Sequence, residues 1–237
     1  MTRGAWLLLV TLLLAAVTAR LGFWQLERAG QKLALQAQQQ ARAQLPPVTL
    51  AGLPLSQQAD EALWQRRASV EGVWAPQETL YLDNRSMNGR AGFFVLTPLL
   101  LDDGRAVLVQ RGWLPRDARD RKRIASYRTE GGRVHVEGRI APEPSRMYEL
   151  GSAASGVIRQ NVDPAARARE TRRRLLPLVI VQDSGSDDGL LRQWPAPTSD
   201  VHRNYGYALQ WFGLCALVIG LYAWFRIIQP RRRRAAR

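Results

Sequence analysis

The sequence predicts an α+β membrane protein in which two transmembrane helices flank an antiparallel β-barrel or sandwich-like extracytoplasmic domain. Two observations lead to this fold class. A stretch of apolar residues about as long as a bilayer is thick lies near each end of the 237-residue chain. Between these stretches, short runs of alternating apolar and polar residues are separated by turn residues, which is typical of strands joined by hairpins.

Changes in composition divide the chain into five predicted segments. The middle of the chain is long enough for one hydrophobic core but small for two domains, so we expect a single soluble domain. The segments are a first transmembrane helix at 5–25, a helical stalk at 26–46, a β-rich extracytoplasmic domain at 47–203, a second transmembrane helix at 204–226 and a cytoplasmic basic tail at 227–237.

The first apolar stretch, Ala5–Phe23, contains a single charge, Arg20, which lies near one end, where its long side chain can reach the membrane surface. Trp6 and Trp24 lie near the two ends, where indole rings favour the interface. A cleaved secretory signal is the alternative, because Val17–Ala19 offers small residues at the spacing that signal peptidase needs. Both interpretations place the following residues outside the cytoplasm.

The second apolar stretch, Tyr205–Phe225, carries no charge and is rich in aromatic residues towards its ends. Arg226 follows at once, and the chain then closes on the arginine-rich run RRRRAAR. Such a tail is expected to stay in the cytoplasm. Two spans then place both termini in the cytoplasm, although more cations follow the first helix than precede it. We favour this topology because the charge asymmetry around the second helix is larger.

The predicted stalk is rich in good helix formers, and Pro46 ends it. Asp102-Asp103-Gly104 predicts a tight hairpin turn between two of the strands that follow. Asp163 is a candidate N-cap, with a proline at the first helical position, for a helix through AARARETRRRLL. The predicted strands are Ala68–Trp74, Thr79–Asp83, Gly92–Leu101, Arg105–Trp113, Arg133–Ile140, Gly156–Val162 and Leu178–Gln182.

The net charge of +14 raises the possibility of a nucleic-acid partner, but no known binding module accompanies it. Nearly all of the cations are arginines, so the codon bias of a GC-rich genome explains the charge better. Cys215 is the only cysteine, which excludes an intramolecular disulfide, and the sequence shows no nucleophile-base arrangement or metal-ligand spacing. We therefore predict a protein that is not an enzyme and binds no nucleic acid.

Three side chains remain as candidates for chemistry. Strand alternation places His135 on an exposed face. His202 lies just before the second helix and could ligate a haem iron while arginines hold the propionates, or it is simply a polar residue at the membrane interface. Alternation places Arg111 and Trp113 on the face of Val107 and Val109. A buried arginine needs a carboxylate, and Asp83 or Glu71 could supply it, as a structural ion pair or as part of a clamp for an anionic ligand.

Three blocks of this sequence resemble the Surfeit-locus family of haem-copper oxidase assembly proteins. They are LGFWQLERAGQK at Leu21–Lys32, the central region Val70–Asp117 with its Thr97-Pro98 pair and its Arg-Gly-Trp triplet, and YGYALQWFGL at Tyr205–Leu214. The blocks have the order and spacing of the family and run through most of the chain. The family's histidine falls three residues before Tyr207, and this chain has Asn204 at that position.

The resemblance implies an assembly factor for cytochrome c oxidase in the bacterial inner membrane, which assists maturation of subunit I at haem a insertion. Its partners would be subunit I, haem a pathway proteins and the membrane, with haem a bound transiently. A membrane scaffold that binds oxidase subunits without haem is the alternative. The candidate cofactor-binding residues are His202 as haem ligand, Arg203 and Trp211, and the candidate partner-binding or structural residues are Trp24, Gln25, Arg28, Arg111, Gly112 and Trp113.

Overall fold

A computed structural model describes residues 3–50, 61–147, 156–194 and 200–231. The chain forms two compact units. One, made of Met1–Gln38 and Pro197–Arg237, contains two long helices, and the other, Gln39–Ala196, contains the strands. Each unit is described by itself.

The helical unit is built from α1 (Arg3–Ala43) and α3 (Val201–Ala223), which continues as a π-helical turn, η3 (Trp224–Ile228). Both helices are long and apolar enough to cross a membrane. At 1.5 Å per residue α1 extends over about 60 Å, roughly twice the thickness of the hydrocarbon core. The helix therefore continues beyond any span, as the stalk prediction required, and it ends at Ala43, shortly before Pro46.

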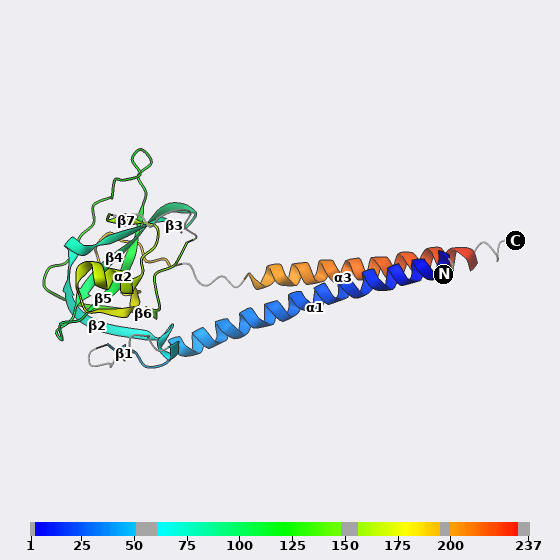
Figure 1. Cartoon of the computed structure of the whole chain (residues 1–237), viewed down its shortest axis with the longest axis horizontal. Coiled ribbons are helices and arrows are strands. Elements are labelled where there is room, and N and C mark those ends of the chain that lie inside the picture. Colours follow the sequence, from blue (N-terminus) through cyan, green and yellow to red (C-terminus); the bar gives the residue numbers. More distant parts are fainter. Residues whose placement is uncertain (1–2, 51–60, 148–155, 195–199, 232–237) are drawn as a thin grey trace. The chain divides into compact units, whose positions relative to one another are not determined.

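The two helices run side by side in opposite directions (Figure 1). The rings of Phe23 and Phe212 meet edge to face with centroids 5.2 Å apart, and the Cys215 thiol lies 3.4 Å from the carbonyl oxygen of Ala15. The residues of α1 that this packing buries are small and recur every seventh position: Ala15, Gly22 and Ala29. Small side chains let two helix backbones approach closely, which drives helix pairing in membranes.

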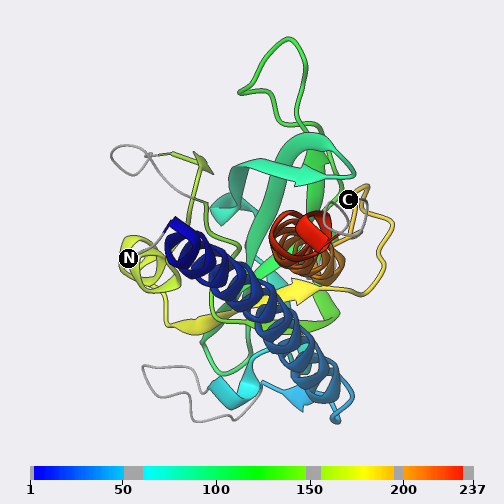
Figure 2. The same ribbon diagram turned by 90° about the vertical axis from the view of Figure 1, so that its right-hand side faces the viewer.

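The β unit is one eight-stranded mixed sheet in the order β1-β2-β6-β8-β5-β4-β3-β7. A short helix, α2, precedes β8, and Figure 2 shows the unit from a second side. The bounds of the strands and of α2 are β1 Val48–Thr49, β2 Arg67–Trp74, β3 Leu80–Met87, β4 Arg90–Leu100, β5 Ala106–Pro115, β6 Arg133–Ala141, β7 Ile158–Arg159, α2 Pro164–Thr171 and β8 Leu175–Gln182.

The sheet corrects the predicted antiparallel barrel or sandwich. Three of its pairings are parallel, namely β1 with β2, β3 with β7 and β5 with β8. The eight strands do not close into a barrel, because β1 and β7 end the sheet. β2 nevertheless also pairs with β4, at Val73 with Leu100 and Trp74 with Leu99, so the sheet curls. Its concave side encloses a hydrophobic core that includes Val70, Leu99, Val109, Val136 and Ile180.

Most local predictions in this unit are confirmed. The hairpin turn forms at Asp102-Asp103-Gly104, with Gly104 at φ +75°. The Asp163 carboxylate caps α2 by accepting hydrogen bonds from the backbone N–H groups of Ala165 and Ala166. The predicted continuation of this helix is wrong: Arg172 is left-handed, which ends the helix, and the chain enters β8 at Leu175.

Candidate functional site

The helical unit holds a polar contact between α1 and α3, centred on Asn204. The amide nitrogen of Asn204 donates a hydrogen bond to Oε1 of Gln25 over 2.7 Å. Its amide oxygen accepts one from the ammonium of Lys32, also over 2.7 Å. All three side chains are partly buried. We call these residues, Gln25, Lys32 and Asn204, the helix clamp.

The other candidate residues of this unit lie outside the helix clamp. His202 is exposed, and nothing in the described parts of the chain is hydrogen-bonded to its side chain. Arg203 pairs with Asp200 at 3.5 Å. His202 is two residues before Asn204, which on a helix is a rotation of about 200°, so the two side chains point in different directions.

The remaining candidates on the helices, Trp211, Trp24 and Arg28, make none of the hydrogen bonds of the helix clamp. Trp211 is partly buried, next to Phe212 in the sequence, whereas Trp24 is exposed. Arg28 donates to the side chain of Gln31 over 3.1 Å on the surface of α1. The structure thus brings Gln25 to α3 but not Trp24 or Arg28.

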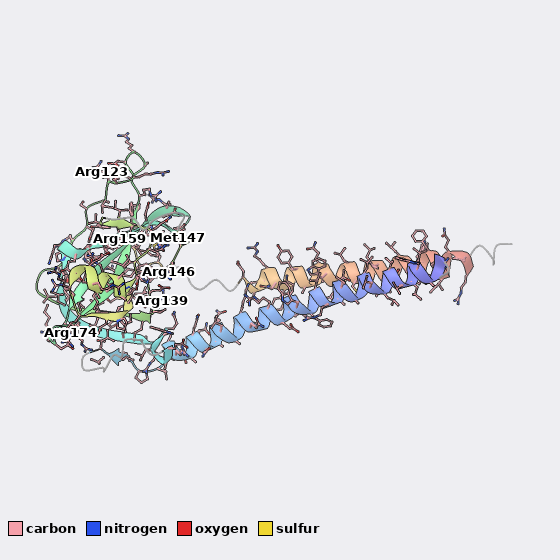
Figure 3. The ribbon with its side chains drawn as sticks, viewed as in Figure 1. Arg123, Arg139, Arg146, Met147, Arg159 and Arg174 are labelled. Carbon is pink, nitrogen blue, oxygen red and sulfur yellow. The ribbon has the colours of Figure 1, made fainter. Side chains whose placement is uncertain are left out.

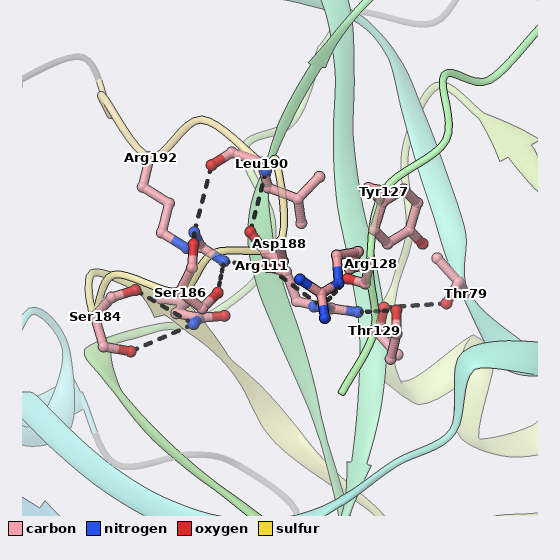
Figure 4. Close-up of polar contacts among 12 residues, drawn as sticks. Thr79, Arg111, Tyr127, Arg128, Thr129, Ser184, Ser186, Asp188, Leu190 and Arg192 are labelled. Carbon is pink, nitrogen blue, oxygen red and sulfur yellow. Dashed lines mark hydrogen bonds and ion pairs between the residues drawn. The ribbon is translucent and has the colours of Figure 1, made fainter. Parts of the chain in front are cut away.

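The β unit holds a second polar centre, built around the buried Arg111 (Figure 4). Its guanidinium donates to the hydroxyl of Thr129 over 2.8 Å, to the carbonyl of Arg128 over 3.2 Å and to the Asp188 carboxylate over 3.3 Å. The same carboxylate accepts from Arg192 over 2.5 Å. The guanidinium of Arg111 also lies 4.5 Å from the ring centroid of Trp74, a cation-π distance.

The predicted burial of Arg111 is confirmed, but both predicted partners are wrong. Asp83 pairs instead with Arg116, and Glu71 pairs with Arg133 and lies beside His135. The true partner, Asp188, comes from the loop Ser184–Gly189, which follows β8 and which we call the SGSDDG loop. Sequence spacing could not reveal it, because the contact joins residues 77 positions apart.

A β-bulge explains why Arg111 and Trp113 do not share a face. Gln110 pairs with Leu96 while Gly112 pairs with Val95, so Arg111 is an extra residue in β5. The extra residue shifts the alternation by one position. Trp113 consequently packs with Leu108 rather than with Val107 and Val109, and that part of the prediction is wrong.

The neighbours of Arg111 in the chain hold the same loop. A side chain at Gly112 would meet the Cβ of Leu190 at 2.5 Å and the carbonyl oxygen of Leu191 at 3.0 Å. Trp113 is buried and exchanges two backbone hydrogen bonds with Leu191, of 2.7 and 3.0 Å. Each residue of the Arg-Gly-Trp triplet therefore holds this part of the chain in its own way. Arg111 forms an ion pair with Asp188, Gly112 leaves room for Leu190, and Trp113 forms a β-bridge with Leu191.

The titration of this centre follows from its burial and its bonds. Burial lowers the pKa of Arg111, while the nearby Asp188 opposes the change. Burial acts to raise the pKa of Asp188, but the hydrogen bonds from Arg192 and from the N–H of Leu190 hold it below its ordinary value. Both groups are therefore charged near neutral pH, and each depends on the other in a dry environment.

A cavity of about 170 Å³ lies beside this centre. Its lining includes Trp74, Arg111, Gln182, Ser184 and Asp188. Both terminal nitrogens of Arg111 are already bonded to protein groups. This occupancy favours the structural ion pair over the anionic ligand clamp.

Comparison with known proteins covers both units. Residues 12–216 match a model of the SURF1 family, a range that includes the helix clamp and the Arg111 centre. The chain belongs to the SURF1 family. A SURF1-like protein of Rickettsia felis is 26% identical over 226 residues, which are 92% of this chain and 96% of that protein.

Two eukaryotic relatives match shorter parts. Surfeit locus protein 1 of Arabidopsis thaliana is 38% identical over 131 residues, 50% of this chain and 37% of that protein. The cytochrome oxidase assembly protein SHY1 of Saccharomyces cerevisiae is 30% identical over 96 residues, 40% of this chain and 24% of that protein. These names describe the two relatives themselves.

The haem ligand expected from the family resemblance does not fit this chain's side chains at the expected position. The resemblance predicts a histidine at position 204, where this chain has Asn204, and both ends of the Asn204 amide are engaged by Gln25 and Lys32. A carboxamide is a poor ligand for haem iron, which is held by imidazole, thiolate, thioether or phenolate groups. His202 is exposed and faces another direction.

Sequence reasoning missed the role of Lys32 and Asn204 as a pair with Gln25, and of Asp188 and Arg192 as partners of Arg111. No local signal joined the second set to Arg111, because Asp188 lies 77 positions further along the chain. The first set left no clear signal either, because Gln25 and Lys32 stand among other polar residues of α1 and Asn204 directly follows two more.

Proposed function

We propose that this chain is a non-catalytic assembly factor for cytochrome c oxidase, which assists maturation of subunit I at the stage of haem a insertion. Membership of the SURF1 family carries the proposal, since the family match spans most of the chain. The yeast relative is named a cytochrome oxidase assembly protein, which supplies the enzyme that is assembled.

The proposed place of action is the bacterial inner membrane. Two helices long and apolar enough to span it lie at the two ends of the chain. With the arginine-rich tail in the cytoplasm, both termini lie there and the β unit lies on the outer side. In the β unit the buried Arg111 and Asp188 bond to each other, and Asp188 also bonds to Arg192, which agrees with a structural role for these charges rather than a catalytic one.

The second candidate function is a membrane scaffold that binds oxidase subunits without binding haem. The helix clamp favours it, because Asn204 replaces the family's histidine and is consumed by Gln25 and Lys32. Under this function the helices serve to present a surface, and haem reaches subunit I by another route.

Deletion of the gene tests the proposed function. We expect loss of cytochrome c oxidase activity and of the haem a absorbance of membranes, while the activity of the dehydrogenases that precede the oxidase stays unchanged. Restoring the gene must restore the oxidase. Full oxidase activity in the deletion strain would remove the proposal.

An optical spectrum of the detergent-purified full chain separates the two candidates. The chain is co-produced with the haem a pathway, beside a His202→Ala variant and an Asn204→His variant. A Soret band that His202→Ala abolishes would make His202 a ligand. No band in the wild type, with a band gained in Asn204→His, supports the scaffold and identifies the substitution at position 204 as its cause.

A further inference from the structure

The long loop between β5 and β6 carries a concentrated positive charge. It runs from Arg116 to Gly132, longer than the roughly 12–15 residues beyond which loops in compact domains are usually functional or disordered. Its first thirteen residues hold six cationic residues and two aspartates. We call this loop, Arg116–Gly132, the basic loop. Figure 3 labels Arg123 at its far end, away from the strands.

Both ends of the basic loop are fixed to the sheet. At the first end Arg116 pairs with Asp83 and packs its guanidinium over the ring of Phe93. At the second end Ile124 and Tyr127 pack against a buried cluster that includes Leu114. The hydroxyl of Tyr127 also lies 3.1 Å from that of Tyr81.

The Arg111 centre holds the second end as well. The backbone N–H of Arg128 donates to the carbonyl of Asp188, and the carbonyl of Arg128 and hydroxyl of Thr129 accept from Arg111. The same buried ion pair therefore ties the SGSDDG loop and the basic loop together. Through Arg111, the Arg-Gly-Trp triplet therefore helps to fix the position of a surface loop.

The far end of the loop is ordered by its own aspartates. The Asp117 carboxylate accepts from the backbone N–H groups of Arg119 and Asp120, bonds that lower its pKa. The Asp120 carboxylate accepts from the N–H of Lys122 over 2.9 Å. Both carboxylates thus hold the backbone of the turn, and Asp117 also pairs with Arg123 at 3.7 Å. Four exposed cations surround them and outnumber the two aspartates; we call these cations the basic tip: Arg119, Arg121, Lys122 and Arg123.

We propose that the basic tip is a docking site for an acidic surface on a partner protein. That this partner is an oxidase subunit rests on the proposed function. Guanidinium groups bind carboxylates through paired hydrogen bonds, and three of the four tip cations are arginines. A loop already ordered at both ends loses little conformational entropy on binding.

A protein fits the basic tip better than a lipid surface does. Amphipathic segments that insert into a membrane surface combine cations with exposed aromatic or aliphatic side chains that enter the bilayer. No large apolar side chain of Arg116–Gly132, all of which the structure describes, is exposed, and Ile124 is turned towards the sheet. The ordered backbone of the basic loop suits recognition of a folded protein surface better than recognition of fluid lipid headgroups.

Photo-crosslinking in the full chain tests the docking site. A photoreactive benzoylphenylalanine replaces the exposed Ala118 beside the tip, and in a control chain the exposed Ala165 of α2. Membranes are illuminated and adducts are identified by mass spectrometry. We expect a protein adduct from position 118 with the crosslink in an acidic segment, and no such adduct from position 165. Adducts with lipid alone would assign the tip to headgroups and overturn the proposal.

Charge reversal gives the decisive comparison. The variant Arg119→Glu, Arg121→Glu, Lys122→Glu is set beside a control with the same change in net charge at other exposed arginines of the β unit, Arg90→Glu, Arg169→Glu, Arg174→Glu. We expect the tip variant to lose about tenfold or more of the adduct, and the wild-type adduct to fall as salt rises from about 0.05 to about 0.5 M.

The outcomes separate this inference from the proposed function. An adduct that the tip variant retains, or that both variants lose equally, overturns the docking site. If gene deletion abolishes the oxidase while the tip variant supports it fully, only the docking site fails. If deletion leaves the oxidase intact but the tip still forms a charge-dependent protein adduct, the docking site stands and the proposed function fails.

Discussion

Asp188 joins three parts of the β unit: strand β5, the SGSDDG loop and the basic loop. It accepts from Arg111 and Arg192 through its side chain and from the N–H of Leu190, and its carbonyl accepts from Arg128. Removing one member of a buried charged set costs more than the set itself contributes, because the remaining charges stay buried without a partner. Replacement of Asp188 should therefore loosen both the SGSDDG loop and the basic loop.

The first prediction concerns Asp188→Asn. We expect it to destabilise the full-length protein by roughly 3–5 kcal/mol, since Arg111 and Arg192 remain buried without a carboxylate. Asp187→Asn is the matched control, because that neighbouring side chain is exposed, and it should change stability by less than about 0.5 kcal/mol. Thermal unfolding of the detergent-purified chains is the measurement. Equal Tm values for the two variants would contradict the assigned role.

The pH dependence of this centre gives the second prediction. Because the folded pKa of Asp188 is below its ordinary value, its stabilisation is complete above the unfolded pKa of about 3.9 and is lost as pH falls through the folded pKa. The Tm difference between wild type and Asp188→Asn should therefore be constant near neutral pH and shrink below about pH 4. A difference that stays constant in acid would show that the charge is not what stabilises the loops.

At the scale of elements, the approach of α1 to α3 depends on a missing side chain. A Cβ at Gly22 would lie 2.7 Å from the ring of Phe212, whereas one at Gly30 would meet nothing within 4 Å. These two glycines of one helix thus separate packing from helix propensity, which alone favours alanine over glycine by about 1 kcal/mol.

The third prediction uses this pair. We expect Gly22→Ala to weaken the helix pair by about 1–3 kcal/mol through overpacking, and Gly30→Ala to leave it unchanged or strengthen it. Ala15→Cys provides the reporter, since Cys215 lies beside that position. Oxidation should join the two cysteines, and the yield, measured by mass spectrometry of the linked peptides, should fall only in Gly22→Ala. A similar fall in both variants would exclude steric separation as the cause.

Sequence patterns predicted the elements that depend on local chemistry. The helix through 43, the hairpin at Gly104 and the cap at Asp163 all follow from residues within a few positions of one another. The parallel pairing of β5 with β8 does not, because their residues are distant in the chain and the pattern of a buried strand says nothing about its neighbour. β1, only Val48–Thr49, is too short to leave a pattern.

The candidate site was predicted in the same uneven way. Burial of Arg111 followed from alternation, but its partner did not, and the bulge at that residue reversed the face of Trp113. A bulge is one extra residue, and alternation within one strand cannot show it without the opposing strand. Likewise, Asn204 was read as a missing ligand, while its bonds to Gln25 and Lys32 required the second helix to be placed.

At the scale of the whole molecule, the fourth prediction concerns topology. Green fluorescent protein fused after Arg237 should fluoresce, because it folds in the cytoplasm, and alkaline phosphatase fused after Gln44 should be active, because it folds outside. Exchanging the two reporters is the control and should abolish both signals. An inactive phosphatase after Gln44 together with a fluorescent protein there would reverse the proposed orientation.

The seven-residue spacing of Ala15, Gly22 and Ala29 limits how the length of α1 can change. An α-helix repeats every 3.6 residues, so a face that recurs every seventh residue stays against its neighbour only if the two helices wind around each other with a left-handed twist. One residue inserted between Gly22 and Ala29 would put the two halves of the face out of phase by about 100°. Variation in the length of this helix should accordingly come in whole heptads, matched on α3, or fall beyond Lys32 where no such phase is imposed.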